Sequence, residues 1–104
     1  MADHDFSALF AKYPKVISAM ADTFTSHQFI LELARRYQTL YVEALYSYRH
    51  HINRKAPAPF LMVHGRLARQ LAEFPKLIRQ THKMVRSRDI FGRDNDCSKW
   101  AKVH

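Results

Sequence analysis

The chain has 104 residues but only one cysteine, two glycines and one tryptophan. With Cys97 alone, no disulfide bond and no thiolate metal cluster can form within one chain. No apolar run approaches the roughly 18 residues needed to span a bilayer, and the first ten residues carry acidic side chains where a secretory signal would carry basic ones. These absences predict a cytoplasmic, intracellular protein with no membrane segment.

The scarcity of glycine also bears on the fold class. Gly65 and Gly92 are the only glycines, the residues that adopt positive φ most readily, and the segments between turns are long and periodic. The sequence therefore predicts a mainly α protein, a single domain over residues 1–104 built from four to five helices.

The arrangements on which catalysis and metal binding depend are also missing. The seven histidines show no spacing that places two ligands on one helix face, and the adjacent His50 and His51 point in different directions. Glu32 and Glu43 form no carboxylate pair, no motif couples Cys97 to a histidine, and no glycine-rich phosphate loop is present. We therefore expect no enzyme activity, no metal site and no cofactor.

Helix signals are strongest near residue 25. Thr25 and Gln28 have the spacing of a capping box, and Phe24 and Phe29 have the spacing of the hydrophobic staple around it. Apolar residues then recur at helical spacing as far as Tyr48, which predicts one long, tyrosine-rich helix over residues 26–50. Shorter helices are predicted over residues 14–21 and 60–74.

The charge is strongly one-sided and unevenly spread. Seventeen Lys and Arg against nine Asp and Glu give a net charge of +8. Residues 76–104 contain eight of the basic and three of the acidic side chains. Within them, residues 76–88 carry five basic side chains and no acidic one, and at 3.6 residues per turn they predict a helix with one apolar and one cationic face. Such a face suits a polyanion, of which duplex nucleic acid is the commonest.

Pro75 would end the helix 60–74 and leave a tight turn before the basic helix. Residues 89–103 have a polar, turn-rich centre between two short apolar segments, which predicts a small β-hairpin.

This order of elements resembles the winged helix-turn-helix domains, with residues 60–103 as the helix-turn-helix and its wing. The likeness rests on residues 64–81, where Leu67, Ala68 and Leu71 look like the core of the first helix. Ile78 takes the place of the residue that packs the second helix against it. The resemblance implies that the helix 76–88 enters the major groove and that the wing touches the adjacent backbone.

The function that follows is that of a small basic DNA-binding protein, transcriptional or architectural, with duplex DNA as its partner. Bases would be contacted from the cationic face of the basic helix, by Lys76, Arg79, Gln80 and Lys83. Phosphates would be contacted by Arg86, Arg88, Arg93, Lys99 and Lys102.

A second hypothesis belongs to another class. The tyrosine-rich helix 26–50 would suit a helical protein–protein interaction module, an adaptor or an inhibitor of an acidic partner, or a homodimer formed through this helix. Under either hypothesis, the single tryptophan, Trp100, is predicted to be buried and to anchor the C-terminal segment to the core.

Overall fold

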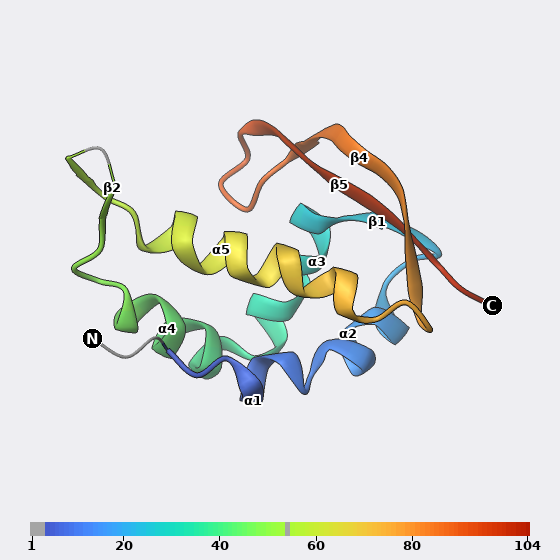
Figure 1. Cartoon of the computed structure of the whole chain (residues 1–104), viewed down its shortest axis with the longest axis horizontal. Coiled ribbons are helices and arrows are strands. Elements are labelled where there is room, and N and C mark those ends of the chain that lie inside the picture. Colours follow the sequence, from blue (N-terminus) through green and yellow to red (C-terminus); the bar gives the residue numbers. More distant parts are fainter. Residues whose placement is uncertain (1–3, 54) are drawn as a thin grey trace.

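The computed structural model describes residues 4–53 and 55–104 (Figure 1). The helical elements are α1 Ser7–Phe10, α2 Tyr13–Ala19, α3 Ser26–Arg36, α4 Gln38–Ser47, α5 Pro59–Gln70 and the 3₁₀ turn η1 Leu71–Glu73. The strands are β1 Thr23–Thr25, β2 Ile52–Asn53, β3 Ala56–Pro57, β4 Ile78–Arg88 and β5 Asp94–Lys102. The fold is therefore α+β, and the predicted mainly α class is wrong.

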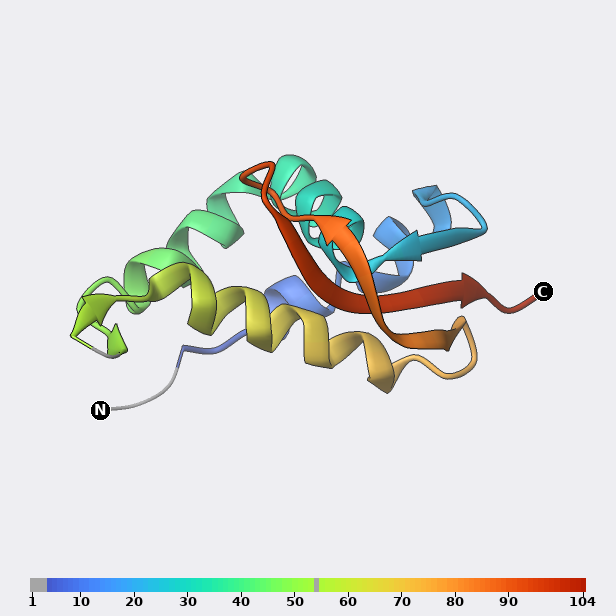
Figure 2. The same ribbon diagram turned by 90° about the horizontal axis from the view of Figure 1, so that it is seen from above.

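The sheet is built around the last strand. β5 lies between β1 and β4, and both pairings are antiparallel. Trp100 on β5 is opposite Phe24 on β1 and Gln80 on β4, so the central strand contributes its tryptophan directly to the core side of the sheet. Figure 2 shows the β4–β5 hairpin running between α5 and α3.

The start of α3 follows the sequence prediction in detail. The Thr25 hydroxyl accepts from the Gln28 amide at 3.2 Å, and the Gln28 side chain accepts from the Thr25 amide at 2.9 Å, which completes the capping box. The rings of Phe24 and Phe29 stack with centroids 6.0 Å apart, as the staple requires. The capping box and the staple are both confirmed.

The prediction of one continuous helix over residues 26–50 is wrong, because two helices, α3 and α4, occupy this segment. It is interrupted at Tyr37, whose φ of −127° and ψ of 57° lie outside the helical region. The Gln38 side chain donates to the Arg35 carbonyl at 3.1 Å and so satisfies a backbone acceptor that the break leaves free. The bend gives α3 and α4 different axes, and both helices contact α5.

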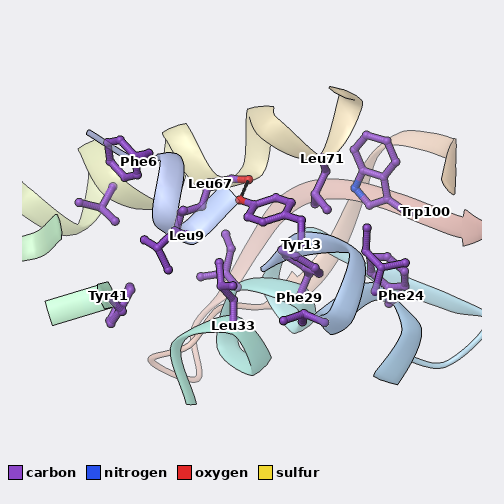
Figure 3. Packing of buried hydrophobic residues seen from close by; sticks show 14 of the residues in the cluster. Phe6, Leu9, Tyr13, Phe24, Phe29, Leu33, Tyr41, Leu67, Leu71 and Trp100 are labelled. Carbon is purple, nitrogen blue, oxygen red and sulfur yellow. Dashed lines mark hydrogen bonds between the residues drawn. The ribbon is translucent and has the colours of Figure 1, made fainter. Parts of the chain in front are cut away.

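Helices predicted over 14–21 and 60–74 are present as α2 and as α5 with η1. They are joined in the core by Tyr13, whose hydroxyl donates to the Leu67 carbonyl at 2.6 Å (Figure 3). Trp100 belongs to the same cluster, is 6% exposed, and donates from Nε1 to the Ser26 hydroxyl at 3.0 Å. The prediction that Trp100 is buried is confirmed.

The prediction of a basic helix over residues 76–88 is wrong, and so is the prediction of a helix-turn-helix with its turn at Pro75. After η1 the chain enters the strand β4 and pairs with β5 from Ile78↔Lys102 to Arg88↔Asp94. Residues 89–103, predicted to be a complete hairpin, hold only the turn and the second strand of one, because its first strand, β4, is the segment predicted to be helical. None of the helices within residues 4–53 and 55–104 has the length and apolar character to cross a membrane.

Candidate functional site

The cationic side chains predicted to bind DNA lie on a hairpin rather than on a helix. Arg79, Gln80, Lys83, Arg86 and Arg88 are on β4, Lys99 and Lys102 are on β5, Arg93 is in the connecting turn, and Lys76 precedes β4. All are exposed except Lys99 and Lys102, which are half-buried. The structure gathers the predicted residues on one element, but the shared helix face expected for Lys76, Arg79, Gln80 and Lys83 does not exist.

Two irregularities bend this hairpin. The pairing of β4 with β5 shifts between Gln80 and His82 and again between His82 and Val85. Such bulges bend a strand and increase its twist. Figure 2 shows the resulting curve of the hairpin beside α5.

Several of the predicted contact residues already have partners within the chain. The Gln80 amide donates to the Ser98 hydroxyl at 2.8 Å, and that hydroxyl donates to the Lys83 carbonyl at 3.1 Å, so Gln80 stabilises the bulged region. Lys102 donates to the Ser18 carbonyl at 3.1 Å, and Arg86 lies 3.4 Å from Asp96. These contacts argue against base reading by Gln80.

The remaining cations are free of carboxylates. In the part of the chain that the structure describes, no carboxylate oxygen lies within 4 Å of Arg79, Lys83, Arg88 or Arg93. All four are exposed, and we call them the hairpin cations. Three carboxylates, Asp89, Asp94 and Asp96, lie on the same hairpin, and Asp94 is opposite Arg88.

Two basic residues of α5 were missed from the sequence. Arg66 lies over the Phe10 and Phe6 rings of the N-terminal segment, at 5.4 and 5.9 Å from their centroids. Arg69 folds back along the helix, so that a Cβ built on Gly65 would be 3.4 Å from its Nη1 atom. The available signal was the absence of any Asp or Glu between Glu43 and Glu73.

A groove of about 860 Å³ separates α5 from the hairpin and is closed on its third side by the start of α3. Its apolar lining includes Phe60, Leu61, Met84 and Phe91, each of which is more than 40% exposed. On the side of α5 and η1, the lining includes Gly65, Ala68 and Ala72, whose small side chains leave space in the groove. We call this feature the α5–hairpin groove.

One end of the groove is an aromatic cluster that ties the hairpin turn to α5. The Phe91 ring lies edge-on to Phe60 with centroids 4.8 Å apart and parallel to His64 at 6.1 Å. His64 Nε2 is 2.5 Å from the Tyr41 hydroxyl. Burial lowers the pKa of His64 to about 4, with nearby Asp89 opposing the shift, and burial raises the pKa of Tyr41 to about 12.

A second histidine of the groove is unsatisfied. His27, in the first turn of α3, has its Nδ1 atom buried without a hydrogen-bond partner among the described residues. A buried ring nitrogen normally has a partner, so this atom is an exception among the buried polar atoms of the described chain. Over residues 4–53 and 55–104, no three His, Cys, Asp or Glu side chains converge as they would around a metal ion.

Comparison with known proteins adds no relative: no family model matches the chain, and no curated protein or solved structure matches it.

Proposed function

We propose that the chain binds duplex DNA, with the β4–β5 hairpin against the phosphate backbone and α5 beside it facing the groove of the duplex. The observation that carries this proposal is the adjacency of two exposed basic elements. Lys83 of the hairpin and Arg69 of α5 line the same α5–hairpin groove, and in the described chain no carboxylate oxygen lies within 4 Å of either of them or of the other hairpin cations. Exposed cations of this kind gain affinity for DNA because they release the counterions held by its phosphates.

The order of elements supports the same proposal. Two helices, α1 and α2, precede β1, and α3, α4 and the short strands β2 and β3 follow it. Then come α5 and the hairpin β4–β5, which completes the sheet in the order β1-β5-β4. This order is similar to that of winged helix-turn-helix domains, with the reading helix moved from residues 76–88 to α5 and the wing moved to residues 78–102. In this arrangement the helix would lie in the major groove and the wing would contact the adjacent backbone.

The residues divide between the two tasks by their position. Arg79, Lys83, Arg88 and Arg93 are long, exposed cations on a curved hairpin and are suited to phosphates. Arg69 is exposed and lies along α5 beside Gly65, and we assign it to a base edge, where Arg pairs with guanine O6 and N7.

The experiment that tests the proposal is a fluorescence anisotropy titration of a random-sequence 20-base-pair duplex at several salt concentrations. If the four hairpin cations neutralise four phosphates, log K should fall with log salt with a slope of about −3.6. No binding at about 50 mM salt would contradict the proposal.

A matched pair of variants separates a local site from general charge attraction. Arg79→Gln with Lys83→Gln removes two charges from the hairpin, and Lys15→Gln with Arg35→Gln removes two exposed charges from α2 and α3. The hairpin pair should reduce the magnitude of the salt slope by about two and the affinity by at least tenfold. The helix pair should leave the slope close to that of the unchanged protein.

One observation favours the second hypothesis of a protein contact. Val42 and Tyr46 are one turn apart on the outer face of α4 and are 59% and 63% exposed. We propose that this face pairs with α4 of a second copy, a contact that leaves the hairpin of each copy free for DNA. Sedimentation velocity should show a concentration-dependent dimer that Val42→Glu abolishes, and a monomer at all concentrations would contradict it.

A DNA-binding function also supports the proposal of an intracellular, cytoplasmic location, which the single cysteine suits.

A further inference from the structure

The outer side of β4 is an unpaired strand edge. In the sheet order β1-β5-β4, this strand has a neighbour on one side only. Figure 1 shows β4 at the upper border of the molecule. Its eleven residues contain neither proline nor glycine. An exposed edge of this length presents backbone donors and acceptors with which another extended chain can pair.

The regular part of this edge is residues 84–88, which we call the β4 edge. Both shifts in the pairing with β5 lie before Val85, and from Val85 to Arg88 the pairing is continuous. Exposed and half-buried positions alternate over the same residues. This alternation is that of an ordinary strand with two different faces, so an added strand can follow it residue by residue.

The free hydrogen-bonding groups of the β4 edge can be identified. In an antiparallel pair, successive residues point their amide and carbonyl groups alternately toward the paired strand and away from it. Asp89 donates to the Arg93 carbonyl at 2.9 Å, so these two residues form a hydrogen-bonded pair. Arg88 and Arg86, one and three positions earlier, therefore direct their amide and carbonyl groups away from β5. Among the described residues, no backbone group of a turn or loop pairs with them.

The side chains of β4 favour an acidic partner. The strand carries four basic residues and no acidic one: Arg79, Lys83, Arg86 and Arg88. On β5, Asp96 lies opposite Arg86 and Asp94 lies opposite Arg88. The described chain places no other carboxylate within 4 Å of either arginine. A guanidinium has five N–H donors, more than one carboxylate uses, whereas a cation placed directly opposite it destabilises a sheet.

We infer that the β4 edge binds an extended acidic segment of a partner protein, which adds a strand to the sheet. Acidic side chains would lie opposite Arg86 and Arg88 on the exposed face, and apolar ones opposite Val85 and Ser87 on the half-buried face. A second copy does not fit, because β4 paired with itself would bring cations together. The inference goes beyond the proposed function, and its test uses no DNA, so either can fail without the other.

Seven-residue peptides test the backbone contact directly. A fluorescein-labelled peptide of alternating Glu and Val, with blocked termini, should bind saturably in fluorescence anisotropy with a Kd below about 1 mM. In an added strand only every second amide points at β4. N-methylation of one alternating set of amides should therefore weaken binding about tenfold or more. N-methylation of the other set should change the Kd by less than about threefold.

Two further comparisons isolate the charge. The same peptide with Gln in place of Glu keeps the shape but loses the negative charges, and it should bind about tenfold more weakly. Arg86→Gln with Arg88→Gln should weaken the Glu and Val peptide about fivefold. Lys15→Gln with Arg35→Gln removes two exposed charges from α2 and α3, and it should change the Kd by less than about twofold.

Arg86→Pro tests the same backbone contact from the side of the protein. Proline lacks the amide that points away from β5, and a strand edge tolerates it where that amide faces solvent. This variant should bind the Glu and Val peptide at least about threefold more weakly than Arg86→Gln, which loses only the charge. Circular dichroism checks that both variants are folded, and the N-methylated peptides decide the question if the proline variant is not.

The inference is overturned if the Glu and Val peptide shows no saturable binding, or if the two N-methylated peptides bind equally, because charge alone would then hold the peptide. Equal binding of the Gln peptide would overturn the acidic partner. A second copy would occupy the edge if Val42→Glu, which lacks the proposed α4 contact, still dimerised in sedimentation velocity and Arg86→Pro abolished that dimer. This result would also overturn the inference.

Discussion

The β1–α3 junction and the β4–β5 hairpin are neighbours in space but differ in what determines their structure. At the junction, residues 23–36, the signals are local: the capping box joins residues three apart, and the staple joins Phe24 to Phe29. In the hairpin, residues 78–102, the backbone pairs residues between 6 and 24 positions apart. The junction could be inferred from a short window of sequence, whereas the hairpin could not.

The bulges explain why the hairpin resembled a helix. An ideal strand with one buried face places its inward residues two apart, but the less exposed positions of β4 are 78, 81, 85 and 87. The first two spacings, three and four, are those of a helix face and span the segment in which the pairing shifts twice around His82, whereas the last, from 85 to 87, is the spacing of two of a regular strand. The apparent helical spacing in this segment therefore belongs to a bulged strand.

The largest expected effect tests what holds the hairpin to the junction. Trp100→Ala removes a buried indole that packs in the core and donates to Ser26, and it should lower the free energy of unfolding by about 3–5 kcal/mol. Urea denaturation followed by circular dichroism measures the loss. Phe91→Ala is the control, because this hairpin aromatic is 54% exposed, and it should cost less than about 1.5 kcal/mol. Equal losses in the two variants would show that the hairpin is not anchored through Trp100.

A second effect depends on pH and concerns the contact between α5 and the hairpin turn. Because burial lowers the pKa of His64 from 6.5 to about 4, the unfolded chain binds a proton in this window and the folded chain does not. Stability should therefore fall as the pH is lowered from 6.5 to 4. The loss should be about 2 kcal/mol, since partial solvent exposure reduces the full linkage value.

The check is a series of urea titrations between pH 4 and 7. His64→Gln keeps a hydrogen-bonding group near the Tyr41 hydroxyl but cannot titrate, so it should flatten the curve in this window. His50→Gln, an exposed histidine after α4, is the matched control and should leave the curve unchanged. A curve that His64→Gln does not alter would assign the pH dependence to other groups.

The sequence was sufficient for the parts of the fold that local physics decides. The helices α2 and α5, the capping box and the burial of Trp100 were predicted, because proline placement, capping residues and apolar spacing act over a few positions. The break at Tyr37 was not, since no proline or glycine marks it and the Gln38 side chain satisfies the exposed Arg35 carbonyl only in the folded geometry.

The sequence analysis named the cationic residues of the candidate site, but it did not predict the secondary structure on which they lie. The cationic residues of 76–104 were recognised because net charge needs no structure. Their placement on a strand and the role of Gln80 as a partner of Ser98 depend on pairing with β5, which no local window reveals. The α5–hairpin groove was missed for the same reason, since its two sides meet only after the sheet forms.

A third effect tests whether local contacts stabilise the β1–α3 junction. Thr25→Ala removes the N-cap of α3 and should destabilise the protein by about 1 kcal/mol. The Thr25 hydroxyl also lies 3.0 Å from the Ser87 hydroxyl of β4, so the loss should exceed that of a purely local cap. Thermal denaturation measures it, with Thr39→Ala on the exposed side of α4 as the control. If Ser87→Ala alone reproduced the loss, the hairpin rather than the cap would stabilise the junction.

The smallest effect concerns the one ion pair that the described hairpin contains. Arg86 and Asp96 lie 3.4 Å apart with 70% and 43% of their side chains exposed, and they face each other across the β4–β5 ladder. Water and salt screen such a pair, so a double-mutant cycle of Arg86→Ala and Asp96→Ala should give a coupling below about 0.5 kcal/mol. If the hairpin is shaped by its backbone pairing and by Trp100, this small value follows. A coupling above about 1 kcal/mol would mean that surface charge also fixes the curvature, and the coupling should then weaken as salt is raised from 50 to 500 mM.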